Sequence, residues 1–364
     1  MNAKVVLSVA ILCAVSCAKN EVGVVPLYND NQIHFSPAPV RAHLTKVDGG
    51  AFPSTTTFGS CAWYLPKGKS WATDAMEGIG YINPVEISYG FDRGLYWKAW
   101  GNGTAEKPEK SYYWPEMGSL TFYSWSPYGM LKGSTGDANC PDSHKLLSVS
   151  KEKGFEIKDW PVENVAGYGD EKHPGIDILL AQTPDCTKAT SKGSVPVRFE
   201  HKLCQVEVKS TLAVPLKAGE VKWKVTKVVL DNIYTKGTFV TNKWTSRSEA
   251  KSYVYVPEGG VEVDYGVKSF IFPLTMMMPQ YLTKDGRLEM PKLTIECTNG
   301  SGEAKTLQAY LYNENSSTSL SAWGHGKRVT YRVILGEEDT FIEFGASAGD
   351  WGTGIDGDVN VGIR

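Results

Sequence analysis

The alternation of apolar and polar side chains with a period of two residues constrains the fold of this chain more than any other feature. It is clearest in Arg328–Leu335, where Val329, Tyr331, Val333 and Leu335 face one side and the polar residues Arg328, Thr330 and Arg332 face the other. Successive side chains of a β-strand point to opposite faces of its sheet. This segment is therefore predicted to be a half-buried antiparallel strand.

Similar runs, alternating or rich in β-branched residues and bounded by Gly, Pro, Asn or Asp, recur along the chain. They are Gln32–Phe35, Val85–Tyr89, Ser119–Trp125, Val195–Lys209, Lys222–Leu230, Ser252–Val256, Lys268–Leu274, Lys292–Cys297, Thr306–Leu311 and Thr340–Gly345. Long helical patterns are missing, and residues 126–175 are predicted to form mainly loops. The spacing favours an all-β protein built from β-sandwiches.

The length of 364 residues exceeds what one hydrophobic core usually serves, so two domains are expected. Pro215 ends one long strand pattern, and a new series of strands begins at Val221. We therefore place the boundary near residue 217, between an N-terminal domain of residues 42–217 and a C-terminal domain of residues 218–364. The net charge of −2 argues against nucleic acid as the main partner.

Residues 1–16 have the pattern of a lipoprotein signal peptide. Lys4 precedes an apolar stretch that is too short to span a bilayer, which takes ~20 residues. Ser16 stands before Cys17, as in the lipobox of bacterial lipoproteins, whose cysteine is acylated, with palmitate among the acyl chains, and becomes the new N-terminus. Ala14 replaces the usual leucine of that motif, and Cys13 is a rival acceptor. A plain signal peptide with an unmodified cysteine is the alternative.

Five further cysteines follow, and none of them belongs to a CxxC pair, so a zinc site has little support. They are Cys61, Cys140, Cys186, Cys204 and Cys297. An exported chain could oxidise Cys140 with Cys186, but the sequence leaves the connectivity open.

No enzyme motif is present: the sequence has no GxSxG, no HExxH, no P-loop and no dinucleotide-binding loop before a helix. His201 falls on one face of a strand predicted to be buried, so we expect a packed, hydrogen-bonded core residue rather than a catalytic base. Asp170, Glu171 and Asp177 could supply a glycosidase pair, but their segment is loop-like and scattered acids are usually solvated. We predict no catalytic residue, no metal and no cofactor.

Aromatic residues are abundant, with eleven Trp and eighteen Tyr. Trp97 and Trp100 could stack on sugar rings, which would suit a monomeric or tip-located surface lipoprotein that binds a glycan or a host ligand. Alternation buries half of each aromatic run, so core packing is favoured for most of these side chains.

Four segments of the chain match the motifs of one protein family, and they occur in the same order. They are "NQIHFSPAPVRA", "SYYWPEMGSLTFYSWSPY", "IDILLAQT" with "VPVRFEHKLCQVEV", and "WGHGKRVTYRVILGEEDTFIEFGASAGDW". Together they resemble the fimbrillin-like family of exported Bacteroidales lipoproteins, the subunits of type V pili. The resemblance implies two tandem transthyretin-like β-sandwich domains, a role in cell adhesion and no catalysis.

The resemblance also implies a route of assembly. A precursor held at the outer membrane by lipid on Cys17 is cut by an Arg-specific protease after its first strand. Residues 17–41 would then hold the tether and the removable strand, with Ile33 and Phe35 as the plug. The bond between Arg41 and Ala42 is the predicted cleavage site. An ordinary surface arginine is the alternative, and tip and anchor subunits of the family keep this strand uncut.

The opened groove would accept an extended segment of another pilin subunit, in a homopolymer or a heteropolymer. In this chain the candidate donor strand is the tail of residues 352–364. Its apolar residues are Ile355, Val359, Val361 and Ile363, and the last three alternate strictly. The alternative is a last strand of its own domain. The position in the pilus, as shaft, tip or anchor, and the adhesion ligand stay open.

Overall fold

The computed structural model describes residues 30–37, 56–89, 97–100, 111–134, 140–167, 175–314, 319–336 and 342–350. Strands form most of the regular structure, so the predicted all-β class is confirmed. The helical elements are α1 (Trp71–Asp74) and the short 3₁₀ turns Ala75–Glu77, Tyr128–Met130 and Asp142–His144. In these parts of the chain, no helix is long and apolar enough to cross a bilayer.

The strands follow one another along the chain in the following order. They are β1 (His34–Pro37), β2 (Phe58–Leu65), β3 (Ile79–Tyr89), β4 (Trp97–Trp100), β5 (Ser119–Ser126), β6 (Leu147–Ser150), β7 (Gly154–Pro161), β8 (Leu179–Cys186), β9 (Ser194–Val197), β10 (Glu200–His201), β11 (Cys204–Leu212), β12 (Trp223–Val240), β13 (Lys243–Tyr255), β14 (Val261–Val263), β15 (Ser269–Met277), β16 (Lys292–Thr298), β17 (Ala304–Tyr310), β18 (Lys327–Leu335) and β19 (Ile342–Asp350).

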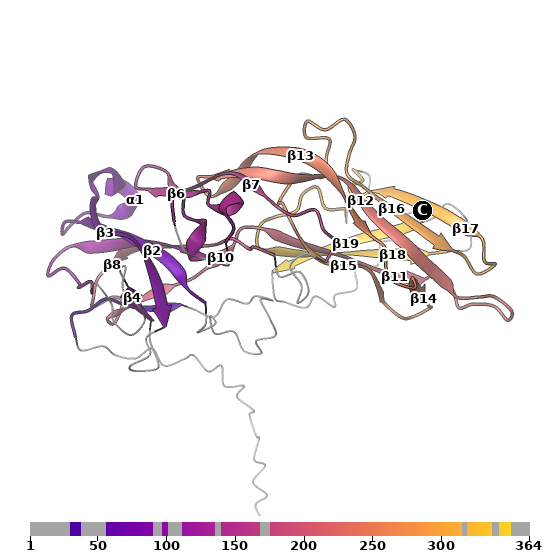
Figure 1. The fold of residues 1–364 in the computed structure, drawn as a ribbon, viewed down its shortest axis with the longest axis horizontal. Helices are drawn as coiled ribbons and strands as arrows, with labels where there is room; N and C mark the ends of the chain where they lie inside the picture. The colour runs from indigo at the N-terminus through magenta and orange to yellow at the C-terminus, as the bar shows by residue number, and fades with distance from the viewer. Residues whose placement is uncertain are drawn as a thin grey trace, which may run out of the picture.

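The N-terminal part of the chain forms an eight-stranded sheet in the indigo and magenta lobe of Figure 1. Its order is β10-β8-β5-β2-β3-β4-β1-β9. All neighbours are antiparallel except β1 and β9, which run parallel. Apolar side chains from β1, β2, β3, β5, β8 and β9 pack together as one buried cluster, which we call the first core.

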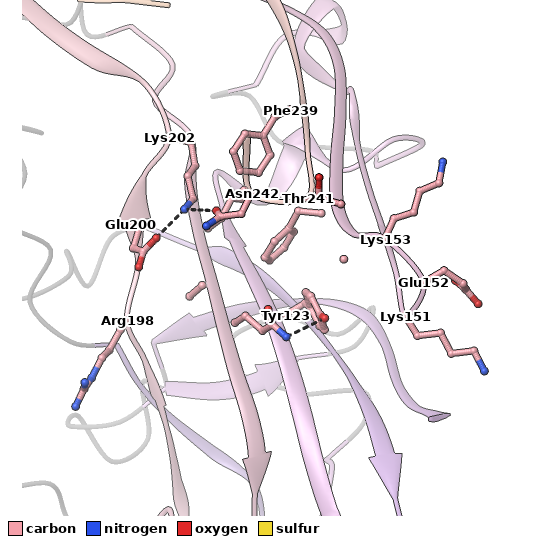
Figure 2. A pocket seen from close by; sticks show the side chains of 15 residues that line it. Tyr123, Lys151, Glu152, Lys153, Arg198, Glu200, Lys202, Phe239, Thr241 and Asn242 are labelled. Carbon is pink, nitrogen blue, oxygen red and sulfur yellow. Dashed lines mark hydrogen bonds and ion pairs between the residues drawn. The ribbon is translucent and has the colours of Figure 1, made fainter. Parts of the chain in front are cut away.

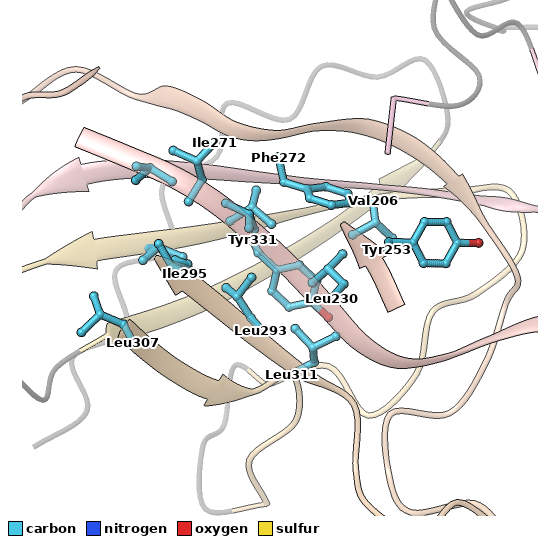
Figure 3. Packing of buried hydrophobic residues seen from close by; sticks show 14 of the residues in the cluster. Val206, Leu230, Tyr253, Ile271, Phe272, Leu293, Ile295, Leu307, Leu311 and Tyr331 are labelled. Atoms are coloured by element: carbon cyan, nitrogen blue, oxygen red, sulfur yellow. The ribbon is translucent and has the colours of Figure 1, made fainter. Parts of the chain in front are cut away.

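The other lobe is a β-sandwich. One layer is the four-stranded sheet β15-β11-β18-β19, and the other is built around β12, with β16 and β17 on one side. Figure 3 shows side chains of both layers directed toward one another, among them Val206, Leu230, Leu293 and Tyr331. These four side chains are fully buried, at 0% exposure. This burial matches the strand alternation of the sequence.

β12 and β13 form a long hairpin that extends from one lobe to the other (Figure 1). The first half of β12 pairs with β14 and β16, whereas its second half pairs with β7. The turn of the hairpin is Thr241–Asn242, with φ of 46° and 60°. Two successive residues with positive φ are typical of the type I′ turn, whose twist suits a β-hairpin.

Strand pairing crosses residue 217, the predicted domain boundary. β6 and β7 precede this residue and join the sheet of β12, and β11 precedes it and pairs with β15 and β18. Strands before and after residue 217 thus share two sheets. The division into residues 42–217 and 218–364 stays a prediction.

Two of the predictions about secondary structure placed strands and loops wrongly. Val195–Lys209 was expected to be one strand, but the structure divides this run into β9, β10 and β11, which belong to two sheets. Residues 126–175 were expected to be mainly loops, but they contain β6 and β7. The division of the first run follows from pairing with distant strands. By contrast, β6 and β7 pair with one another in a hairpin, and β7 also pairs with the distant β12.

The five cysteines within the described residues are all buried and form no disulfide. The pairing of Cys140 with Cys186 is therefore not formed. Burial raises the pKa of Cys186 to about 11 and that of Cys297 to about 11. Thiols with such pKa values carry little thiolate at neutral pH and react slowly, so these cysteines serve as apolar core residues.

Candidate functional site: the inserted first strand

β1 lies inside the eight-stranded sheet rather than at its edge. On one side it pairs with β4, with Phe35 opposite Trp97. On the other side it runs parallel to β9, with Phe35 beside Val195 and Ser36 beside Pro196. The backbone of β1 is thus paired on both sides, by strands that follow it much later in the chain.

The residues just before β1 are also held by backbone hydrogen bonds. The Ile33 amide donates to the Tyr112 carbonyl at 2.8 Å, and the Trp114 amide donates to the Asn31 carbonyl at 2.9 Å. The Gln32 side chain donates to the Ser111 hydroxyl at 2.7 Å. The segment that contains β1 is therefore fixed along its whole described length.

The side chains of Ile33 and Phe35 are each 1% exposed and belong to the first core. The Phe35 ring meets the rings of Phe58 and Phe122 edge to face, with centroids 5.8 and 5.7 Å apart. Edge-to-face aromatic pairs add roughly 0.5–1.5 kcal/mol to the stabilisation from area burial. Both residues thus fill the first core, and their role as a removable plug stays a prediction.

His34, between these two residues, is also 1% exposed. Its Nε2 lies 2.9 Å from Oδ1 of Asp30, whose side chain is 49% exposed. Sequence reasoning missed this residue, because alternation predicts that it faces solvent. The contact with Asp30 gives this buried imidazole a polar partner, although neither strand pairing nor alternation predicts its burial.

The "SYYW" segment supplies much of the wall around β1. Tyr112 and Trp114 are buried in the first core, whereas Tyr113 is 55% exposed. Trp114 also donates its indole N–H to the Gly193 carbonyl at 3.4 Å. The prediction that most aromatic residues pack in the core is confirmed for this segment.

Several predicted site residues lie outside the described residues. These are Cys17, Arg41, Ala42, Ile355, Val359, Val361 and Ile363. Trp97 and Trp100 lie on β4, where the backbone alone is described, so their role in stacking on sugars stays a prediction.

His201 is a buried core histidine, as the sequence predicted. It is 7% exposed, and its Nδ1 is bonded to Oδ2 of Asp177. Asp177 is 5% exposed and also accepts from the Ile178 amide at 2.7 Å, so the expectation of a solvated acid was wrong for this residue. The two other acids of that set lie outside the described residues. No group of three or more His, Cys, Asp or Glu side chains in the described ranges could hold a metal ion.

A comparison with protein families matches residues 45–351 to the family described as fimbrillin-like. The chain belongs to the fimbrillin-like family. Among solved structures, this fimbrillin-like chain is similar to a fimbrial protein from Bacteroides vulgatus ATCC 8482. The identity is 16%, the TM-score is 0.63, and the match covers 88% of this chain and 100% of the other.

The chain is also similar to the tip fimbrial protein Mfa3 from Porphyromonas gingivalis with C-terminal truncation. Here the identity is 10%, the TM-score is 0.43, and the match covers 88% of this chain and 99% of the other. A comparison with curated protein sequences gives no match.

Membership of the fimbrillin-like family makes the chain a subunit of a pilus or of another adhesion structure, and not an enzyme. Its place is the cell surface or a pilus. The inserted β1 is the part of this fimbrillin-like fold that the following proposal concerns.

Replacing Phe35 by alanine should lower the free energy of unfolding of the intact chain by roughly 3–5 kcal/mol, because the change leaves a cavity in the first core. Ser36→Ala in the same strand is the matched control and should change the free energy by less than about 0.5 kcal/mol. Urea unfolding followed by tryptophan fluorescence measures both. Equal effects of the two substitutions would contradict the packing described for β1.

Proposed function

We propose that this fimbrillin-like chain is a structural pilus subunit, exported as a lipoprotein precursor and assembled by donor-strand exchange after proteolysis. One observation carries the proposal: β1 is buried and paired on both sides, yet it is the first strand in the described part of the chain. A strand in this position can be detached by one cut without interrupting any of the later strands.

The interval between Pro37 and Phe58 is the place for such a cut, since it is the covalent link between β1 and β2. Arg41 lies in this interval, and the Arg41–Ala42 bond is the proposed cleavage site. The family match begins at residue 45, after this bond. This agreement supports a body that starts near Ala42 and a leader that ends at Arg41.

Loss of β1 would leave the facing backbone groups of β4 and β9 unpaired. It would also uncover the part of the first core that Ile33 and Phe35 now cover. Burying each of these side chains contributes roughly 1.5–3 kcal/mol, and open strand edges readily pair with other chains. An extended segment of another subunit can restore both the backbone pairing and the core contacts.

The tail of residues 352–364 is the proposed donor. Val359, Val361 and Ile363 alternate with other residues, which is the spacing of Ile33, just before β1, and Phe35 in β1. A strand with this pattern presents its apolar side chains on one face, as the groove requires. The family match ends at residue 351, so the tail lies beyond the shared body.

The lipid anchor completes the proposal. Acylation of Cys17 would hold the precursor at the outer membrane through the same leader that contains β1. One cut at Arg41 would then release the subunit from the membrane and open its groove together. A subunit that is never cut would stay anchored with its groove filled.

Incubating the purified precursor with an Arg-specific protease should cleave after Arg41 and yield a ladder of SDS-resistant oligomers. Mass spectrometry of the body should find Ala42 as its first residue. Arg41→Ala should abolish both the cleavage and the ladder, whereas Arg198→Ala, which removes an exposed arginine between β9 and β10, should change neither. Oligomers that form equally well from Arg41→Ala would contradict the proposal.

Val361→Asp tests the donor tail, because a carboxylate cannot enter an apolar groove without a large desolvation cost. Cleaved Val361→Asp should stay monomeric on a denaturing gel, with an unchanged stability of the uncut precursor. Asn360→Asp places the same charge one residue earlier, on the opposite face, and should still assemble. A loss of precursor stability in Val361→Asp would instead indicate that the tail is a strand of its own domain.

A further inference from the structure

A pocket of about 540 Å³ opens in the N-terminal lobe, away from β1. Its walls come from β5 and β8, from the turn between β6 and β7, from residues 198–202, and from the turn of the β12–β13 hairpin. Pockets that hold small ligands commonly have volumes of 300–1,000 Å³. The proposed strand exchange and the packing of the first core do not explain why this pocket is present.

Lys202 supplies a buried charge to one wall. It is 3% exposed, and its Nζ donates to Oε2 of Glu200 at 2.7 Å and to Oδ1 of Asn242 at 3.0 Å. An ammonium group has three N–H donors, so a third remains for a ligand. Figure 2 shows this chain of polar groups at the pocket, with Lys202 between Glu200 and Asn242.

The hairpin turn holds Asn242 over the pocket. Its φ of 60° belongs to the left-handed region, where Asn is among the few residues that are readily accommodated. Its side-chain oxygen already accepts from Lys202, which fixes the amide and leaves the Nδ2 hydrogens as donors. The position of this amide is therefore set before any ligand arrives.

The opposite wall offers a second polar pair. The Tyr123 hydroxyl accepts from Nε1 of Trp71 and from Nε2 of Gln182, each at 3.0 Å. Burial raises the pKa of Tyr123, so its hydroxyl stays protonated and can donate in turn. The carbonyl oxygen of Gln182 adds an acceptor beside it.

Aromatic rings separate these two polar groups. Tyr123 and Phe155 meet edge to face with centroids 5.1 Å apart, and Phe239 lies 5.7 Å from Nζ of Lys202. In Figure 2 the charged ends of Lys151, Glu152 and Lys153 point away from the pocket. The interior thus combines apolar rings with donors and acceptors, and its one buried charge is compensated by Glu200.

We propose that this pocket binds a neutral pyranose unit of a glycan. A pyranose has hydroxyl groups that both donate and accept, together with an apolar face of C–H groups. Lys202 and Asn242 would donate to its hydroxyls, and Glu200 and Gln182 would accept from them. The rings of Phe155, Phe239 and Tyr123 would cover its C–H face. Because β1 does not line the pocket, binding is independent of cleavage and assembly.

Saturation-transfer NMR on the full-length purified chain tests the proposal, with galactose and N-acetylglucosamine as neutral probes and N-acetylneuraminic acid as the acidic one. A neutral probe should give transfer at millimolar concentration. Asn242→Gly keeps the turn, because glycine adopts positive φ readily, and should weaken binding at least tenfold. Gln182→Ala should also weaken binding of the neutral probe.

Asn232→Gly is the matched control, since Asn232 has a φ of 58° and does not line the pocket. It should bind the neutral probe as the unmodified chain does. Three results would overturn the proposal: no transfer from either neutral probe, transfer from the acidic probe alone, or binding of a neutral probe that Asn242→Gly and Gln182→Ala leave unchanged.

Discussion

The two-sided pairing of β1 is the constraint on which the N-terminal lobe depends. β1 lies between β4 and β9 and pairs with each of them, and its Phe35 packs against the rings of Phe58 and Phe122 in the first core. Without a strand in this place, two edges and a patch of core would face water, a state that exposed strand edges make prone to association. The lobe therefore needs some strand there, but nothing in backbone pairing requires that the strand come from the same chain. Backbone hydrogen bonds form equally well with a strand of the same chain or of another chain, so exchange between subunits is physically reasonable.

The β12–β13 hairpin connects the two lobes of the subunit. β12 contributes to the sandwich of one lobe and pairs with β7 of the other, so the two lobes share a strand. The same hairpin ends in the turn that overlies the proposed sugar pocket. Assembly at β1 and ligand binding at the hairpin turn would thus use separate surfaces of one subunit.

The sequence predicts local features of this fold well and long-range ones poorly. The alternation in Arg328–Leu335 corresponds closely to β18, and the spacing of Ile33 and Phe35 matches their burial. Lys222–Leu230 was too short for β12, because register shifts after Leu230 and after Gly237 interrupt the two-residue period. The parallel pairing of β1 with β9 depends on residues about 160 positions away. The pocket joins side chains from five segments, which no short motif could indicate.

A reversible clamp on β1 tests the central claim most directly. Ser36 and Pro196 are register partners on β1 and β9, half-buried and exposed respectively, so cysteines at both positions could be joined across the two strands. We expect the oxidised Ser36→Cys/Pro196→Cys chain to be cut by the Arg-specific protease and to stay monomeric, and to assemble once a reductant is added. Assembly of the oxidised, cleaved chain at the rate of the reduced one would show that β1 does not leave, and would contradict the account.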